Sequence, residues 1–319
     1  MQNTNRPLVS IVTPSFNQAA FLPATLHSIL SQNYDHLELI VMDGGSTDGS
    51  VSVLEAIDDP RLTWVSEPDR GQSHALNKGM ARARGDILTY LNSDDLLTPN
   101  TVAFIVEYFE THPDIDLLFG DCAYIDAQGQ TTRVVKGIPF ELRTSLTAAP
   151  PGLFQQGAFW RRRVYERVGE FDESLHYTMD SEYWVRAGVM GCSFAYVPGV
   201  RGQFRFHGES KTVSQVTAFW RDWRTSLDKL YARPELPREA RNWRAESIDY
   251  LDWHDAKMAW VQKDYATARP MLRRFLRGKK WVRRGLAAPM LVDSYLGTPF
   301  TRTMTGTYKR LRGVDLLAP

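Results

Sequence analysis

The first 120 residues alternate short apolar runs with segments whose apolar residues recur at helical spacing, and this alternation constrains the fold more than any other feature of the chain. The expected strands are residues 8–13, 37–42, 62–65, 87–91 and 116–119, and the expected helices are residues 21–31, 50–57, 74–84 and 101–111. Ser73 stands where it can cap the third helix. Because strands that alternate with helices form a parallel sheet covered on both faces, the sequence predicts a doubly wound α/β fold.

The pattern changes after residue 120. Turn signals interrupt residues 121–215, where we expect a helix to begin near Asp180 and a strand to follow at residues 193–197. From about residue 217 the pattern is helical and rich in tryptophan. We therefore expect one domain over residues 1–215, with halves that meet at residue 120, and a helical region over residues 216–319.

The composition is ordinary for a soluble globular protein, with 43% hydrophobic and 24% charged residues in a chain of 319. The first residues lack the basic start and apolar stretch of a signal peptide, and no apolar run approaches the ~18 residues that a membrane-spanning helix needs. Cys122 and Cys192 show neither a pairing motif nor metal-ligand spacing. We expect a cytoplasmic chain with two packed thiols.

The near-neutral total charge conceals an asymmetry. Residues 269–319 hold twelve Lys/Arg and two Asp/Glu, a net charge of +10, which leaves −9 for residues 1–268. A helix over residues 271–286 would separate a basic stripe from an apolar one. The basic stripe is Arg273, Arg277, Lys280 and Arg284, and the apolar stripe is Met271, Phe275, Val282 and Leu286. Such a helix suits an anionic membrane surface, reached through residues 269–312, unless it packs on the acidic body instead. No RNA-recognition motif accompanies it, so no nucleic-acid partner is expected.

Polar residues follow three of the expected strands. Residues 15–17 follow the first strand, Asp43 follows the second, and residues 92–95 follow the fourth. In open α/β sheets, ligands bind at the carboxyl ends of the strands. We therefore expect these residues to share one site.

Asp94 and Asp95 place two carboxylates side by side at a strand end. Two adjacent carboxylates repel each other unless a cation or hydrogen bonds compensate. Mg²⁺ or Mn²⁺ would compensate and would also bind a diphosphate. The alternative is a turn in which Asp95 caps the next helix.

Asp43 precedes two glycines, which allow close approach of a ligand to the backbone. Its carboxylate can accept the ring N–H of uracil, thymine or guanine, or it can serve as an ordinary turn aspartate. Arg70 and Lys78 lie at a later loop-to-helix junction, where phosphates are readily bound.

Five motifs stand together in a fixed order. They are Pro14-Ser15-Phe16-Asn17, Asp43-Gly44-Gly45-Ser46-Thr47-Asp48, Glu67-Pro68-Asp69-Arg70-Gly71, Ala75-Leu76-Asn77-Lys78-Gly79 and Leu91-Asn92-Ser93-Asp94-Asp95. In this order and spacing the chain resembles family 2 glycosyltransferases over residues 8–210. The resemblance implies a GT-A fold, with residues 1–120 as the nucleotide-sugar half and residues 121–215 as the acceptor half. Within the family, the chain looks like enzymes of bacterial surface-polysaccharide assembly.

The resemblance also implies a donor site and a metal. The expected donor-binding residues are Pro14, Ser15, Asn17, Asp43, Arg70, Lys78, Asn92, Ser93 and Asp95. Asp94 would be the metal-binding carboxylate of the family's Asp-x-Asp motif, whose first position is Asn92 in this chain. His207, in an Arg-x-His loop, would complete the metal shell or contact phosphate, against the alternative of a structural histidine.

Asp180 stands where the family places its general base, and Met179 replaces the usual acidic neighbour. The alternative for Asp180 is an ordinary helix N-cap. Residues 155–157 fall where relatives make polar contacts to the acceptor.

The resulting hypothesis is an inverting glycosyltransferase that depends on Mn²⁺ or Mg²⁺. It would move a sugar from a UDP, dTDP or GDP donor to a saccharide or lipid-linked acceptor, in the cytoplasm and peripherally on the inner face of the cell membrane. The alternatives are a nucleotidyltransferase that acts on sugar phosphates and a non-catalytic protein that binds nucleotide sugars.

Overall fold

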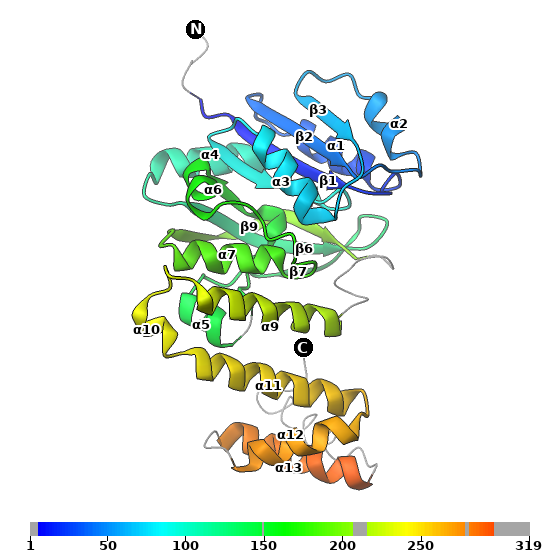
Figure 1. The fold of residues 1–319 in the computed structure, drawn as a ribbon. Helices are drawn as coiled ribbons and strands as arrows, with labels where there is room; N and C mark the ends of the chain where they lie inside the picture. Colours follow the sequence, from blue (N-terminus) through cyan, green and yellow to red (C-terminus); the bar gives the residue numbers. More distant parts are fainter. Residues whose placement is uncertain (1–5, 149, 207–215, 278–280, 297–319) are drawn as a thin grey trace. The chain divides into compact units, whose positions relative to one another are not determined.

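The computed structural model describes residues 6–148, 150–206, 216–277 and 281–296, and the chain divides into two compact units, residues 1–241 and 242–319 (Figure 1). The strands of the first unit are β1 (Val9–Ser15), β2 (Leu37–Asp43), β3 (Leu62–Ser66), β4 (Ile87–Tyr90), β5 (Leu96–Leu97), β6 (Leu117–Ile125), β7 (Thr131–Val135), β8 (Phe159–Arg161) and β9 (Phe194–Arg205). Its helices are α1 (Leu22–Leu30), α2 (Ser50–Glu55), α3 (Gln72–Arg82), α4 (Thr101–Thr111), α5 (Leu142–Thr147), the 3₁₀ turn η1 (Gln155–Gly157), α6 (Arg162–Val168), α7 (Met179–Val189), α9 (Val216–Ala232) and α10 (Arg238–Arg241).

The strands form one mixed sheet in the order β3-β2-β1-β4-β8-β6-β9-β5, with β7 paired to β6. The strands predicted in the first 90 residues, β1 to β4, are present and pair in parallel. β6 and β9 are also parallel to each other, whereas β8 lies antiparallel between β4 and β6. The three-residue β8 and the two-residue β5 are too short to give a periodic signal in the sequence.

Helices cover both faces of the sheet because successive strand residues point to opposite sides. Val9 and Ile11 of β1 belong to a core cluster with residues of α1 and α4. Val12, the next residue, belongs to a second cluster with residues of α3, α6 and α7. The doubly wound arrangement is therefore confirmed.

Two details of the sequence prediction are wrong. Gly71, at a φ of 116°, precedes α3, so Ser73 lies within the first turn and does not cap the helix. Its hydroxyl instead lies 2.8 Å from the sulfur of Met179. The single helix expected over residues 271–286 is two helices, since one ends at Arg277 and the next begins at Trp281.

The second unit contains α11 (Arg244–Val261), α12 (Tyr265–Arg277) and α13 (Trp281–Leu296). Its core includes Trp253 of α11, Leu272 and Phe275 of α12, and Met290 of α13. Phe275 was expected on the apolar stripe of a helix that binds a membrane surface. In the structure it is buried and packs edge-on against Trp253. No helix in the described parts of the chain is long and apolar enough to cross a membrane.

Candidate active site

A cavity of about 480 Å³ opens at the carboxyl ends of β1 and β4, within the size range of ligand pockets. One wall comes from the chain after β1, the start of α3 and the loop after β4. The other wall comes from η1, the start of α7, and residues of β6, β9 and α9. Elements distant in the sequence thus converge on one site.

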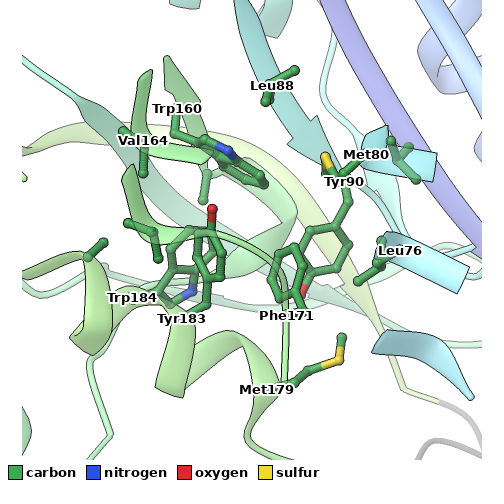
Figure 2. Packing of buried hydrophobic residues seen from close by; sticks show 14 of the residues in the cluster. Leu76, Met80, Leu88, Tyr90, Trp160, Val164, Phe171, Met179, Tyr183 and Trp184 are labelled. Carbon is green, nitrogen blue, oxygen red and sulfur yellow. The ribbon is translucent and has the colours of Figure 1, made fainter. Parts of the chain in front are cut away.

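Aromatic packing supports Tyr90, one of the residues that line this cavity. Tyr90, at the end of β4, lines the cavity and contacts Phe171 edge-to-face with ring centroids 5.5 Å apart. Phe171 stacks on Tyr183 of α7 at 4.3 Å, and Trp160 of β8 packs against Trp184 at 5.3 Å (Figure 2). Because fully buried rings of this size leave little room to shift, they hold the start of α7 against the central strands.

Asp94 and Asp95 diverge in the loop after β4. Asp94 lines the cavity, whereas Asp95 is fully buried behind it. Asp95 Oδ1 accepts the backbone N–H of Arg205 at 2.9 Å, and its Oδ2 accepts Nε2 of Gln156 at 2.9 Å. Burial and the charge of Asp94 raise the pKa of Asp95 well above its ordinary value. Of the two carboxylates, Asp94 is therefore the one that lines the cavity.

The side chain of Asn92 links this loop to α3. Its Oδ1 accepts a hydrogen bond from Gln72 Nε2 at 2.6 Å, and its Nδ2 donates to Asp95 Oδ2 at 3.3 Å. An amide at this position can donate to Asp95, which a carboxylate could not do. The departure from the family's usual acidic residue thus has a local structural reason.

Helix α1 anchors the same loop from below. The hydroxyl of Thr25, a buried residue, lies 2.9 Å from the carbonyl oxygen of Ser93 and 2.8 Å from that of Asp95. The guanidinium Nε of Arg205 donates to the carbonyl of Asp94 at 2.8 Å. The backbone of the loop is therefore held by α1 and by β9.

Asp43 is buried and turned into its own loop. Its carboxylate accepts hydrogen bonds from the backbone N–H groups of Gly45 and Ser46 and from the hydroxyls of Ser46 and Ser66. Asn17, at a φ of 53°, also supports this loop by accepting the N–H of Thr47 at 2.9 Å. Neither residue lines the cavity.

Asp69, unlike Asp43, is one of the residues that line the cavity. Its Oδ1 accepts the N–H of Gly71 at 2.7 Å, and its Oδ2 lies against Gly44. Phe16, which is 59% exposed, borders the same part of the cavity beside Pro14 and Ser15. The carboxylate and the exposed ring together form a place for a flat, hydrogen-bonding group.

Arg70 and Lys78 are engaged in ion pairs away from the cavity lining. Arg70 binds Glu173 at 2.6 Å, and Lys78 binds Glu67 at 2.8 Å. Lys78 holds the pKa of Glu67 below its ordinary value, chiefly by its hydrogen bond. The predicted contact of these two cations with phosphate stays a prediction.

Asp180 lies in the first turn of α7 and lines the cavity. Burial raises its pKa, and hydrogen bonds such as the 2.6 Å bond from the N–H of Ser181 oppose that rise. A carboxylate with a raised pKa is a stronger base than an exposed one.

The structure brings six of the twelve predicted site residues to the lining of one cavity. Pro14, Ser15, Asn92, Ser93, Asp94 and Asp180 line the cavity, whereas Asn17, Asp43, Arg70, Lys78 and Asp95 are not among its lining residues. His207 lies outside the described residues. Among the residues that are described, no group of three or more His, Cys, Asp or Glu side chains forms a metal cluster.

Sequence reasoning missed several lining residues. They are Phe16, Asp69, Gln72, Tyr90, Tyr124, Phe154, His176, Tyr177, Phe204 and Phe219. Phe16 and Asp69 lie inside motifs that the sequence displays, so they could have been found there. The aromatic residues of the second half have no local pattern that distinguishes them from core residues.

Two comparisons of sequence bear on this site. Residues 10–169 match the sequence model of the family described as Glycosyl transferase family 2. An uncharacterised glycosyltransferase of Mycobacterium tuberculosis is 34% identical over 189 residues, which are 59% of this chain and 71% of that protein. A PGL/p-HBAD biosynthesis glycosyltransferase of Mycobacterium bovis is 30% identical over 184 residues, which are 56% and 69% of the two chains.

Solved structures show the same fold. A mannosyltransferase from Pyrobaculum calidifontis, in complex with GDP-Man and Mn²⁺, has a TM-score of 0.62 at 21% identity and covers 97% of this chain and 88% of its own. Residues 1–349 of S. aureus TarS, in complex with UDP-GlcNAc, have a TM-score of 0.61 at 15% identity. The match covers 95% of this chain and 92% of the TarS chain. These likenesses confirm the expected GT-A fold.

Proposed function

Because the chain belongs to glycosyl transferase family 2, we propose that it transfers a sugar, with inversion, from a UDP, dTDP or GDP donor to a saccharide or lipid-linked acceptor of bacterial surface-polysaccharide assembly. The observation that carries the proposal is that Asp94 and Asp180 line one cavity together with Pro14, Ser15 and Phe16. Family membership sets aside a nucleotidyltransferase and a non-catalytic binding protein.

The first wall of the cavity suits a nucleoside diphosphate. Phe16 offers a ring for the base, and Asp69 offers a carboxylate for its ring N–H. Asp43, the residue expected to accept that N–H, already accepts four hydrogen bonds from its own surroundings, so we assign the contact to Asp69. Gly71 and Gln72 place the amino end of α3 at the cavity, where the helix dipole favours a diphosphate.

The oxygen chemistry of Asp94 fits a divalent cation. Mg²⁺ and similar hard ions are usually held by one or two carboxylates together with substrate phosphates and water. Of the adjacent pair, Asp94 is the carboxylate that lines the cavity. The oxygens of Asp95 already accept hydrogen bonds from Arg205, Gln156 and Asn92. When bound there, Mn²⁺ or Mg²⁺ would offset the negative charge that develops on the departing diphosphate.

Asp180 would act as the general base. Its carboxylate takes the proton from an acceptor hydroxyl while that oxygen forms a bond to the anomeric carbon. The bond from the anomeric carbon to the diphosphate breaks on the opposite face, and the diphosphate leaves toward the amino end of α3. One base and one displacement give an inverted configuration at the anomeric carbon.

The wall of the cavity that includes η1 has side chains suited to an acceptor sugar. Gln155 is 4% exposed, and its Oε1 has no hydrogen-bond partner in the described part of the chain. Its Nε2 donates to the carbonyl of Tyr90, and Gln155 is one of the residues that line the cavity. A buried acceptor atom of this kind is stabilised when a ligand hydroxyl donates to it. Tyr124 and Phe154 beside it provide apolar faces for a sugar ring.

The basic second unit supports a membrane-bound acceptor. Arg273, Arg274 and Arg277 of α12 are exposed, in a region that carries a net charge of +10 from residue 269 onward. Anionic headgroups attract such clusters. We expect the protein to pellet with anionic vesicles at low salt and to remain in solution with neutral vesicles. Absence of any difference between the two would remove the membrane from the proposal.

The test of the donor site is thermal stabilisation by a panel of UDP, dTDP, GDP, CDP and ADP sugars, with and without Mn²⁺. A ligand at 100 times its Kd stabilises the folded state by about 2.7 kcal/mol, so no acceptor is needed. We expect a Mn²⁺-dependent rise in melting temperature with a donor of the first three groups. A folded protein that responds to none of them would contradict the proposed function.

A further inference from the structure

The segment of residues 171–178, between α6 and α7, is bound on two sides. On one side Asn77 of α3 exchanges two hydrogen bonds with the backbone of Phe171, each 2.9 Å long. On the other side α9 contacts the segment through side chains spaced four and three residues apart, which lie on one face of the helix. These side chains are Asp222, Ser226 and Lys229.

Among these side chains, Asp222 makes the largest number of hydrogen bonds to the segment. Its Oδ2 accepts three consecutive backbone N–H groups, those of His176 at 2.9 Å, Tyr177 at 2.7 Å and Thr178 at 3.3 Å. The hydroxyls of Thr178 and Ser226 lie 2.9 Å apart. A single carboxylate that accepts three backbone donors fixes the direction of the chain at that point.

The chain that Asp222 fixes leads directly into α7. Thr178 is the N-cap of α7, and its own side chain makes no capping hydrogen bond. Asp180 follows two residues later, in the first turn. Thr178 is buried, so a change in the path of residues 176–178 would move the first turn and the carboxylate of Asp180 with it.

Helix α9 also reaches the cavity itself. Phe219, one turn before Asp222, lines the cavity together with His176 and Tyr177. The contact of Asp222 therefore lies at the border of the acceptor wall.

We propose that Asp222 is a positioning residue, which sets the place of the Asp180 carboxylate relative to the acceptor hydroxyl. This inference rests on the proposed function, in which Asp180 is the base. It gives α9, which carries no family motif, an indirect part in the chemistry, through the position of Asp180.

The test is a double-mutant cycle of Asp222→Ala with Asp180→Asn, read as kcat and as the Kd for the donor. Misplacement of a catalytic group by about 1 Å can cost roughly 100-fold in rate, so we expect Asp222→Ala to lower kcat roughly 10- to 100-fold. The donor Kd should change by less than about threefold, because the donor wall is untouched. On the Asp180→Asn background, Asp222→Ala should have no further effect on kcat, because the group through which it acts is already absent.

Asp222→Asn is the conservative variant. Its amide oxygen can accept the same three N–H groups that Oδ2 accepts, so it should recover most of the rate lost in Asp222→Ala. Asp228→Ala, which removes an exposed carboxylate from the same helix, should keep the full rate. Should Asp222→Ala fail to fold, Ser226→Ala carries the same cycle, since it removes the hydroxyl that meets Thr178.

Three results would overturn the proposal. They are an unchanged kcat in Asp222→Ala, an equal loss of kcat on both backgrounds, and a donor Kd that weakens as much as kcat falls. A full rate in Asp180→Asn alone would instead contradict the proposed function, because it would remove the base.

Discussion

Gly44 lies directly against Asp69, so that a Cβ added to Gly44 would fall 2.7 Å from Asp69 Oδ2. Gly44 does not have a positive φ, so the backbone itself would accept a side chain. The same Cβ would lie 3.2 Å from the ring of Phe16. The absence of a side chain at position 44 thus makes room for the carboxylate and the ring that we assign to the nucleobase.

Gly44→Ala should weaken nucleotide binding because it displaces the Asp69 carboxylate. A hydrogen bond to a charged group contributes about 1.5–3 kcal/mol, which corresponds to roughly 10- to 100-fold in Kd. Calorimetric titration with UDP, dTDP and GDP measures the loss without an acceptor. Gly285→Ala is the matched control, because a Cβ there meets nothing within 4 Å. Equal binding by both variants would remove Asp69 from the base contact.

Asp94→Ala should impair metal-dependent donor binding, whereas Asp95→Ala should lower the stability of the fold. Loss of Asp94 should abolish the Mn²⁺-dependent part of donor binding and leave most of the stability intact. Loss of Asp95 leaves the N–H of Arg205 and the amide of Gln156 without their buried acceptor, at a cost of about 1–3 kcal/mol for each group. Urea unfolding and Mn²⁺-dependent thermal shifts of both variants distinguish the two. A metal response that survives in Asp94→Ala would contradict the assignment.

Asp180→Asn should lower kcat by roughly 10²- to 10⁴-fold while donor binding stays near that of the unmodified protein. In the unmodified protein the base works only when deprotonated. Since burial raises the pKa of Asp180 above 3.8, the rate should begin to fall on acidification at a higher pH than an exposed aspartate would give. A pH series of kcat checks this, and the residual rate of Asp180→Asn should lack that acid limb.

The same substitution should increase stability at neutral pH. A carboxyl group whose pKa is higher in the folded state binds its proton more tightly there, so its contribution to folding is greatest at low pH and is lost as the pH rises through the folded pKa. Asp180→Asn removes the cost of the half-buried, partly desolvated charge at pH 7 and removes nothing once the group is protonated. The gain in unfolding free energy should therefore shrink toward zero as the pH falls below 3.8. An equal gain at both ends of the pH range would show that charge is not its cause.

Glu182→Ala should be strongly destabilising. Glu182 and Arg186 form an ion pair with side chains only 2% and 4% exposed, and Arg186 also donates to the carbonyls of Val168 and Glu170. Removal of one partner from a buried pair costs about 3–5 kcal/mol because the other charge remains buried. Asp35→Ala, which breaks an exposed pair with Arg6, should cost no more than about 1 kcal/mol. Chemical denaturation of the two variants tests the contrast.

The sequence predicted the parts of the fold that repeat a long pattern. Helix α4 occurs at the predicted residues 101–111, and β1 to β4 lie within two residues of their predicted bounds. β9, predicted at residues 193–197, continues to Arg205. Its continuation includes Pro198 and Gly199, and pairing with β6 extends the strand to Arg205.

The candidate site was predicted only in part, for a physical reason. A motif shows which residues stand near a strand end, but not which way each side chain turns. Asp43 and Asp69 illustrate this limit, because hydrogen bonds turn the first into its loop and leave the second on the cavity. Asp222 carries no signal at all, since its contacts lie 44 to 46 residues away in the sequence.

The anchoring of residues 92–95 by Thr25 and Arg205 has a thermodynamic consequence. Ordering a flexible backbone costs roughly 1–2 kcal/mol per residue, and a loop that became ordered only on binding would subtract that cost from the affinity. Here the loop is already ordered in the folded protein, because its backbone is hydrogen-bonded to α1 and β9. If Asp94 holds the proposed cation, it does so on a loop that is already ordered, so the affinity at this end of the cavity should reflect chemical fit rather than loop closure.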